Sequence, residues 1–313
     1  MIVLLLIPLA LPWILPPLAR RTAGRVRPET ALWTITAAAV ALAVGVLACL
    51  GALLLPLALT IPPLAAVSEL VRPLRAGPPL PVLGVSALAA GVLAVTAVTT
   101  LRRAVTEGRR LRRAHVDVAH LPHTGGLCVL DDPRPDAYAL PGLRGPGRIV
   151  VTSGMLRSLD PREREALLAH ERAHLAARHH LFLAAAQLAG WCHPALAAVV
   201  PDVSYAAERA ADEAAARAAG DRALTARAVG RAALAATRGG RERPRVSPLA
   251  AGAVTGPVPA RVKALLTGAP ARRLAPALLA MALLCTAAGT SALAGAVRLH
   301  RGVEVAQGER PAG

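Results

Sequence analysis

From Ala31 to Ile61 the chain runs without a single charged side chain. About 20 apolar residues in a helix cross the hydrocarbon core of a bilayer, so this stretch can span a membrane with some tilt. Three more apolar stretches approach that length, at about Ile2–Ala19, Pro81–Leu101 and Leu274–Val297. Buried core helices of a soluble protein are the alternative, but all four stretches reach spanning length. The sequence therefore predicts a mostly α-helical integral membrane protein with four transmembrane helices.

The net charge of +17 comes almost entirely from arginine, because Lys263 is the only lysine. So basic a chain can indicate a nucleic-acid-binding protein. However, aromatic residues make up only 2% of the sequence, and it contains no groove-reading motif. The arginines cluster beside the apolar stretches instead, as the positive-inside rule describes for membrane proteins. We therefore expect the lipid bilayer as a partner and no direct binding of nucleic acid.

The arginines also predict an orientation and a domain organisation. Four follow the first apolar stretch, two lie between the second and third, and six follow the third. The positive-inside rule then places the segment after the third helix in the cytoplasm. We expect a membrane region at residues 1–101 with three helices, a cytoplasmic domain at 102–273, a last transmembrane helix at 274–297 and a short external tail at 298–313. The protein would be a multi-pass protein of the cell membrane.

The cytoplasmic part divides into two kinds of local pattern. Short apolar runs separated by Pro, Gly and Asp lie between residues 115 and 155 and predict strands, at Leu127–Leu130, Tyr138–Leu140 and Ile149–Thr152. Residues 160–238 are alanine-rich and predict helices, the first of them started by Asp160 with Pro161 and Glu163. Residues 239–258 are rich in Gly, Pro and Arg and read as a linker.

The motif with the clearest chemistry is HERAH, which runs from His170 to His174. Positions i and i+4 share one face of a helix, so both imidazoles can bind a single metal ion. Glu171 then lies close enough to face a metal-bound water and act as a general base. Two helix histidines without a function are the alternative, but the motif follows a clear helix cap. The sequence thus predicts a metal site with Glu171 as the catalytic residue.

A catalytic zinc ion has three protein ligands and one open position, so a third ligand is required. Glu208 is the candidate, with Asp212 four residues later on the same helix face. The carboxylate of Asp212 can accept a hydrogen bond from a ligand histidine and fix its tautomer. Spacing alone does not separate these roles from those of two solvated acidic residues.

An HExxH motif followed about forty residues later by ExxxD resembles two related families of gluzincin membrane peptidases. One is the HtpX/Ste24-type (M48), the other the BlaR1/MecR1-type (M56). The similarity covers roughly residues 115–266, through a strand at Ala137–Leu140, a strand-to-helix segment at Ile149–Leu156, the helix extension to His179 and a late helix at Pro259–Leu265. Asp136 replaces the asparagine of the family strand, and Gly256-Pro257 replaces a family His-Pro.

The expected membrane layout, with three helices before the peptidase domain and one after it, is most similar to the M56 type. Segments Pro28–Trp33 and Trp191–Pro194 also resemble that type. Only 16 residues follow the last predicted helix, so we expect no penicillin-binding sensor domain. An apolar segment at 181–200 separates the two metal-binding helices. It is interpreted as a hairpin that dips into the membrane, because a full crossing would separate Glu208 from His170.

The resemblance implies a zinc metalloendopeptidase with a gluzincin-like α+β domain, one Zn²⁺ per chain and a protein or peptide substrate. That substrate would add as a strand along Tyr138, Ala139 and Leu140, as edge-pairing peptides do. Three residues are candidates for stabilising the oxyanion: Tyr205, His193 and Arg261. His179 and His180 are expected at the surface, since they lie five and six positions past His174.

Two biological roles fit this enzyme: a signalling protease that cleaves a DNA-binding repressor, or an HtpX-like quality-control protease for membrane proteins. A catalytically silent, zinc-binding membrane scaffold is a third alternative, although structural zinc sites have four ligands and no base. A transporter or channel is disfavoured because charged residues are missing from the apolar stretches.

Overall fold

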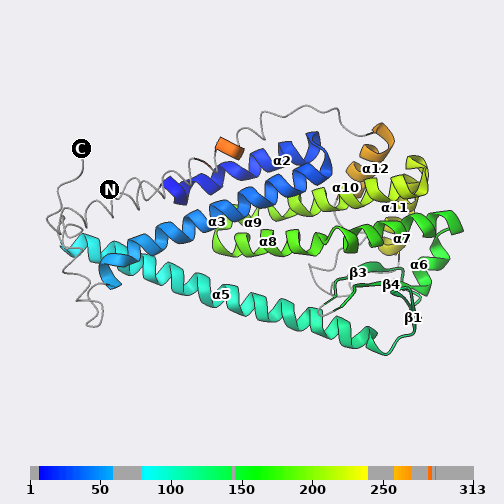
Figure 1. Ribbon diagram of the computed structural model, residues 1–313, viewed down its shortest axis with the longest axis horizontal. Coiled ribbons are helices and arrows are strands. Elements are labelled where there is room, and N and C mark those ends of the chain that lie inside the picture. Colours follow the sequence, from blue (N-terminus) through cyan, green and yellow to red (C-terminus); the bar gives the residue numbers. More distant parts are fainter. Residues whose placement is uncertain are drawn as a thin grey trace.

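The computed structural model describes residues 7–58, 79–142, 145–238, 257–268, 281–283 and 286. Its described part is mostly helical, with one small sheet (Figure 1). The N-terminal elements are η1 (Leu11–Ile14), α2 (Leu15–Arg25), α3 (Pro28–Ala58) and α5 (Pro79–Ala119). The strands are β1 (His123–Thr124), β2 (Leu127–Leu130), β3 (Ala137–Leu140) and β4 (Arg148–Thr152). The later helices are α6 (Ser153–Ser158), α7 (Pro161–Ala176), α8 (His179–Cys192), α9 (Pro194–Ala197), α10 (Val200–Ala219), α11 (Arg222–Arg238) and α12 (Val258–Thr267).

Two of the described helices, α3 and α5, are long and apolar enough to cross a membrane. They pack together at one end and diverge toward the other, where the sheet lies (Figure 1). Only 11% of the apolar window of α5 is buried, which differs from the core helix of a soluble protein. The described part of the first apolar stretch forms η1 and α2, and nearly all of the last stretch lies outside the described residues. Four transmembrane helices therefore remain a prediction.

The sheet has the strand order β1-β2-β4-β3. β2 and β4 are parallel, whereas β3 is antiparallel to β4 and forms an edge of the sheet. The three longer strands coincide with the predicted apolar runs, extended by one residue at Ala137 and at Arg148. The C-terminal part of α5 covers one face of the sheet, where Ala114 and Val118 pack with Tyr138. The other face packs against α7, through Leu167 and Val151.

Helix α7 begins as its sequence predicts. Asp160 accepts a hydrogen bond from the backbone N–H of Glu163, and the Glu163 carboxylate accepts one from the backbone N–H of Asp160. Such a reciprocal cap satisfies two N–H groups that a helix start would leave without partners. Beyond this start, α7 packs along α10.

Helices α8, α9 and α10 form a hairpin after α7, with the reversal at His193-Pro194. Leu183 and Ala186 of α8 are buried in a common apolar core with Ile35 and Leu42 of α3. The segment predicted to separate the metal-binding helices thus packs along a candidate membrane helix and returns. α10 then runs beside α7 (Figure 1).

Candidate metal centre

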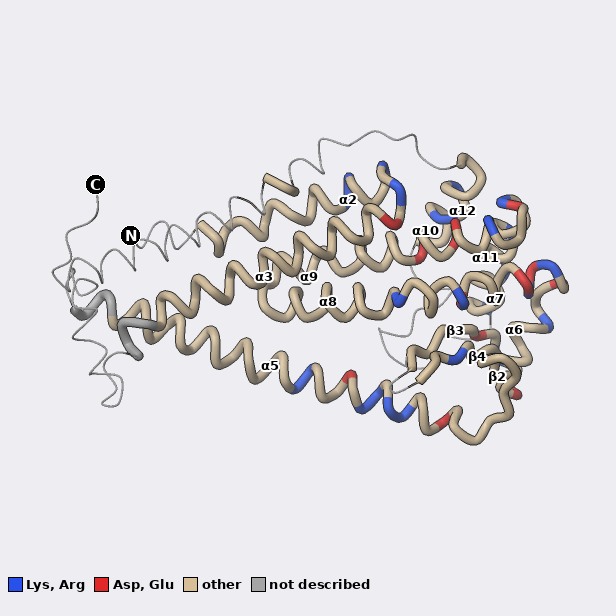
Figure 2. The backbone as a smooth tube through the Cα atoms, in the orientation of Figure 1, with Lys and Arg blue, Asp and Glu red and all other residues tan. Residues whose placement is uncertain are grey.

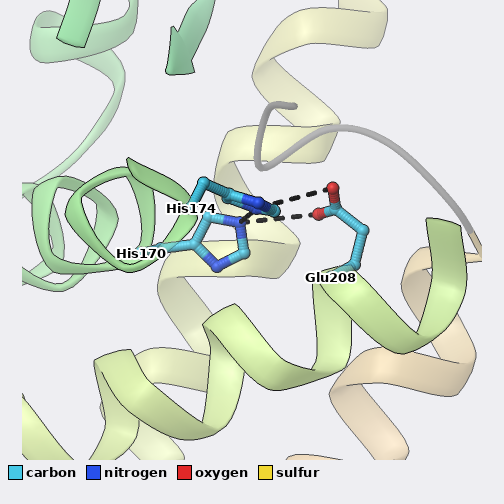
Figure 3. A group of neighbouring side chains, drawn as sticks. All are labelled: His170, His174 and Glu208. Carbon is cyan, nitrogen blue, oxygen red and sulfur yellow. Dashed lines mark hydrogen bonds and ion pairs between the residues drawn. The ribbon is translucent and has the colours of Figure 1, made fainter. Parts of the chain in front are cut away.

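The HExxH helix and the ExxxD helix meet at a cluster of three buried side chains. Nε2 of His170 and Nε2 of His174 face each other at 3.1 Å. The Glu208 carboxylate of α10 lies 3.5 Å from Nε2 of His170 and 3.6 Å from Nε2 of His174 (Figure 3). All three side chains are only 1–2% exposed. Two imidazole nitrogens and one carboxylate oxygen, converging on one point, fit the donor set of a catalytic zinc ion.

Asp212 lies on the far side of His170 from this point. Its Oδ1 is 3.0 Å from Nδ1 of His170, one helical turn after Glu208 on the same face of α10. When the ring is neutral, a proton on Nδ1 that is hydrogen-bonded to this carboxylate leaves Nε2 unprotonated and directed toward Glu208. The two acidic residues of α10 therefore hold opposite sides of one imidazole.

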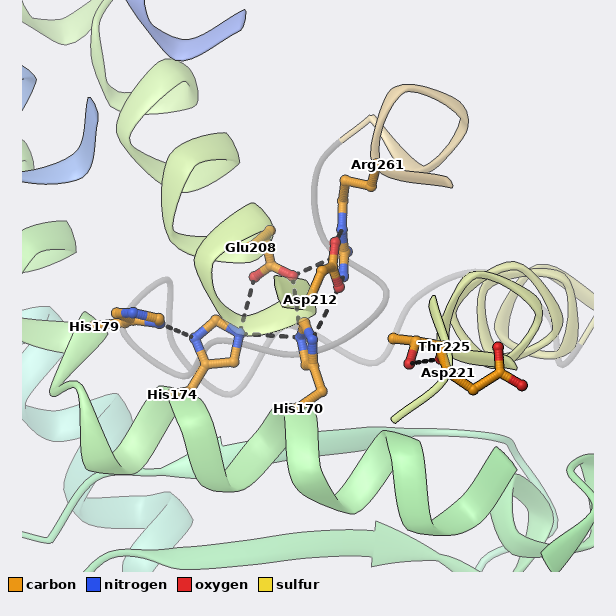
Figure 4. A network of polar contacts seen from close by, with 8 residues as sticks. All are labelled: His170, His174, His179, Glu208, Asp212, Asp221, Thr225 and Arg261. Atoms are coloured by element: carbon orange, nitrogen blue, oxygen red, sulfur yellow. Dashed lines mark hydrogen bonds and ion pairs between the residues drawn. The ribbon is translucent and has the colours of Figure 1, made fainter. Parts of the chain in front are cut away.

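Arg261 of α12 contacts the carboxylates of both Glu208 and Asp212 (Figure 4). Its guanidinium donates from Nε to Asp212 Oδ2 at 2.8 Å and from Nη2 to Asp212 Oδ1 at 2.6 Å. Its Nη1 lies 2.9 Å from Glu208 Oε2. The side chain is fully buried, at 0% exposure. Arg261 was predicted as one of three candidates to stabilise the oxyanion, but these contacts direct its guanidinium to Glu208 and Asp212.

His179 is not at the surface, so that prediction was wrong. Its side chain is buried, and its Nδ1 lies 2.9 Å from Nδ1 of His174 (Figure 4). Arg178, just before it, has a φ of +51°, and this left-handed residue separates α7 from α8, which continues away from the end of α7 (Figure 1). His179 lies beside the outer nitrogen of His174, as Asp212 does for His170. His180 is half-buried.

The electrostatics of the cluster follow from burial and from these neighbours. Burial lowers the pKa of His170, but the hydrogen bonds that its ring donates to the Asp212 and Glu208 carboxylates outweigh burial and raise the pKa to about 9. His174 lacks such a carboxylate on its outer nitrogen, so burial and the neighbouring positive charges hold its pKa well below the usual range. The Asp212 carboxylate is buried too, yet Arg261 and His170 lower its pKa to about 2. Asp212 is therefore an anion at neutral pH.

Glu171 is fully buried on α7 next to His170. Its charge raises the pKa of Arg261, although by less than Glu208 and Asp212 do. The carboxylate of Glu171 thus lies within electrostatic reach of the same cluster.

The other two oxyanion candidates differ in their distance from the cluster. Tyr205 lies one turn before Glu208 on α10, with its ring 5.9 Å from the guanidinium carbon of Arg209. His193 caps α9 and contacts the ring of Trp13. It follows the far end of α8, about 20 Å along the helix from its start beside the cluster. Tyr205 is therefore the better placed of the two.

The predicted substrate strand is β3, and all four of its residues are buried. Tyr138 and Leu140 pack toward α5, and Ala137 packs toward the α7 side. Among the residues that the structure describes, β3 pairs only with β4, so it is an edge strand, and it lies next to the helix that carries the histidines. An edge strand in this position is what peptide addition requires.

The model of peptidase family M48 matches residues 106–269, which is just over half of the chain. The matched segment begins within α5 and ends two residues after α12. It therefore contains the sheet and every side chain of the cluster. Neither a curated protein nor a solved structure gave a significant match.

Proposed function

The chain belongs to peptidase family M48, and we propose that it is a zinc-dependent metalloendopeptidase that works at a membrane. The observation that carries this proposal is the buried cluster of His170, His174 and Glu208 inside the matched segment. The two helices long enough to cross a membrane support the membrane association.

In this proposal His170, His174 and Glu208 hold one Zn²⁺ per chain. When bound, zinc polarises the scissile carbonyl group and lowers the pKa of a bound water to about 7. Three protein ligands leave a coordination position for water, as catalytic zinc sites do.

The other residues of the cluster bind, orient and move protons. Asp212 accepts a hydrogen bond from the Nδ1–H of His170, and His179 makes the corresponding contact with His174, so the Nε2 atoms of both ligands face Glu208. Glu171 is the general base: its carboxylate takes the proton of the attacking water and delivers it to the leaving amine. Tyr205 is the candidate that would stabilise the oxyanion.

An extended protein or peptide substrate would add to the edge of β3 along Tyr138, Ala139 and Leu140. Main-chain hydrogen bonds would then hold the scissile bond beside α7 without requiring a fixed sequence. The strand order places β3 at the edge of the sheet and next to α7, which supports substrate binding along this strand.

We expect the peptidase domain to face the cytoplasm of a multi-pass protein. Arginines cluster directly after the apolar part of α5, which supports this orientation. Reporter fusions after Arg113 and after Arg238 should both read cytoplasmic, and a fusion after Gly302 should read external. Opposite readings on the two sides of Leu181–Val200 would contradict the proposed metal site.

The enzymatic proposal is tested on the purified full-length protein in detergent. The protein should contain one zinc per chain and cleave unfolded casein, and a chelator should abolish cleavage until zinc is returned. A zinc-loaded wild type that cleaves nothing would favour the catalytically silent scaffold instead.

Two biological roles are alternatives for this enzyme. One is cleavage of a DNA-binding repressor, as in the M56-type receptors, and the other is clearance of damaged membrane proteins, as in HtpX-like enzymes. Glu171→Gln should retain substrate without cleaving it, because glutamine keeps the shape of glutamate but takes no proton. Crosslinking of this variant in the native cell, followed by mass spectrometry, distinguishes the roles. One enriched repressor indicates signalling, whereas an assortment of membrane proteins indicates clearance.

A further inference from the structure

A basic groove lies between α5 and the α8–α10 hairpin, apart from the metal centre. It has a volume of about 550 Å³. Its α5 wall consists of Arg102, Arg103, Thr106, Glu107 and Arg110, and its opposite wall consists of Gln187, Gly190, Trp191, Ala197 and Val200. This volume falls within the range of ordinary small-molecule sites, about 300–1,000 Å³.

The charge of the groove selects an anionic ligand. Glu107 is its one acidic residue, and it pairs with Arg110 at 2.9 Å. Arg102 and Arg103 have no acidic partner among the residues that the structure describes. Three arginines against one glutamate leave two positive charges in excess on one wall.

The position of the groove along α5 indicates where that anion would come from. Arg102 and Arg103 directly follow the apolar stretch that ends at Leu101, and Figure 2 shows the basic bands of α5 beginning partway along the helix. Leu88 and Val95 precede Arg102 by fourteen and seven residues, so all three lie on one face of the helix. Leu88 is 70% exposed and Val95 is 63% exposed. An uncovered apolar stripe thus leads directly to the basic groove.

The opposite wall of the groove contains a residue that is typical of the boundary between lipid and water. Trp191 of α8 is amphipathic, and tryptophan is enriched where headgroups meet the hydrocarbon core. Gly190 has no side chain, and a Cβ there would come within 2.9 Å of Ala197 Cα, so the hairpin is closely packed behind the groove. The groove is therefore backed by tightly packed helices on that side.

We propose that this groove binds the headgroup of an anionic phospholipid, with the acyl chains along the exposed apolar stripe of α5. Basic pockets between membrane helices on the cytoplasmic side bind such headgroups. A free phosphate ion would use the arginines but not the stripe, and a transmembrane peptide would use the stripe but not the charge. A lipid with an anionic headgroup uses both.

The test is native mass spectrometry of the full-length protein in detergent, mixed with equal amounts of phosphatidylglycerol and phosphatidylcholine. Wild type should retain phosphatidylglycerol in preference. Arg102→Gln with Arg103→Gln should weaken that binding by about 30-fold, the effect of two arginines at an anionic surface. The matched control is Arg112→Gln with Arg113→Gln, which removes the same charge from the same helix outside the groove and should change binding by less than about threefold.

Two further measurements distinguish binding of the lipid in the groove from simple attraction to the charge of the arginines. Thr106→Trp fills the groove and keeps all three arginines, so it should also displace phosphatidylglycerol. Glycerol 3-phosphate, which has the phosphate without acyl chains, should not compete at equal concentration. Equal retention of the two lipids, equal loss in the control pair, or full competition by glycerol 3-phosphate would each overturn the proposal. Because binding is measured without catalysis, these outcomes do not depend on the peptidase activity.

Discussion

Replacing Arg261 with methionine should destabilise the protein more than any other single arginine replacement around the site. Methionine keeps most of the length and the apolar body of the side chain but removes the guanidinium. Arg261 makes two hydrogen bonds to Asp212 and an ion pair with Glu208, and it is fully buried. The variant would leave these two carboxylates buried without their common positive partner.

The expected magnitude follows from that burial. Removing one partner of a buried ion pair costs about 3–5 kcal/mol, because the remaining charge stays desolvated. In a domain of this size, 1 kcal/mol shifts the melting temperature by about 2–4 °C, so the loss should be on the order of 10 °C. Zinc bound at Glu208 would neutralise part of the uncovered charge, so the loss should be larger in chelated protein than in zinc-loaded protein.

The assay is thermal unfolding of the full-length protein in detergent, with and without chelator. Arg217→Met is the control, because Arg217 lies 3.5 Å from Glu29 and both side chains of this pair are at least half exposed. Partly exposed pairs contribute about 0–1 kcal/mol, so the control should lose only a few degrees. If the two variants melt within a few degrees of each other in chelated protein, the proposed structural role of Arg261 is wrong.

The remaining predictions concern the contacts of the metal ligands. Glu208→Ala should remove most of the bound zinc, measured by elemental analysis of purified protein, whereas Glu213→Ala on the same helix should retain it. Asp212→Asn should weaken zinc binding by about 10–100-fold, the usual effect of losing a partner that orients a ligand, and competition with a chelating dye measures this. His179→Phe keeps an aromatic ring beside His174 but removes the hydrogen bond, so it should weaken zinc binding within the same range. Unchanged zinc affinity in His179→Phe would show that the contact between the two histidines is only packing.

Local patterns predicted much of this fold because their causes are local. The cap at Asp160 and the spacing of His170 and His174 depend on residues within one or two helical turns. The strands were recognisable as short apolar runs, but their order was not. Whether β3 lies at an edge or in the centre depends on pairings between distant segments, which short apolar runs do not encode.

The contacts around the candidate metal ligands depend on pairings between distant parts of the chain, and these were harder to predict from the sequence. His179 was expected at the surface because it lies five positions past His174, and helical spacing offered no reason to bring the two together. The left-handed residue Arg178 interrupts the helix, so His179 does not follow the regular spacing of α7, and its Nδ1 lies beside Nδ1 of His174. Arg261 lies 49 residues after Asp212, across a Gly- and Pro-rich segment, so only the packing of α12 reveals their pairing.

We propose that this cluster hydrolyses peptide bonds with Glu171 as its base. The most direct test compares zinc content and casein cleavage in wild type, Glu171→Gln and the control Glu165→Gln, an exposed position on the same helix. We expect full zinc in all three proteins, and a loss of about 10²–10⁴-fold or more in turnover for Glu171→Gln alone. Cleavage by Glu171→Gln at a rate near that of the wild type would contradict the claim.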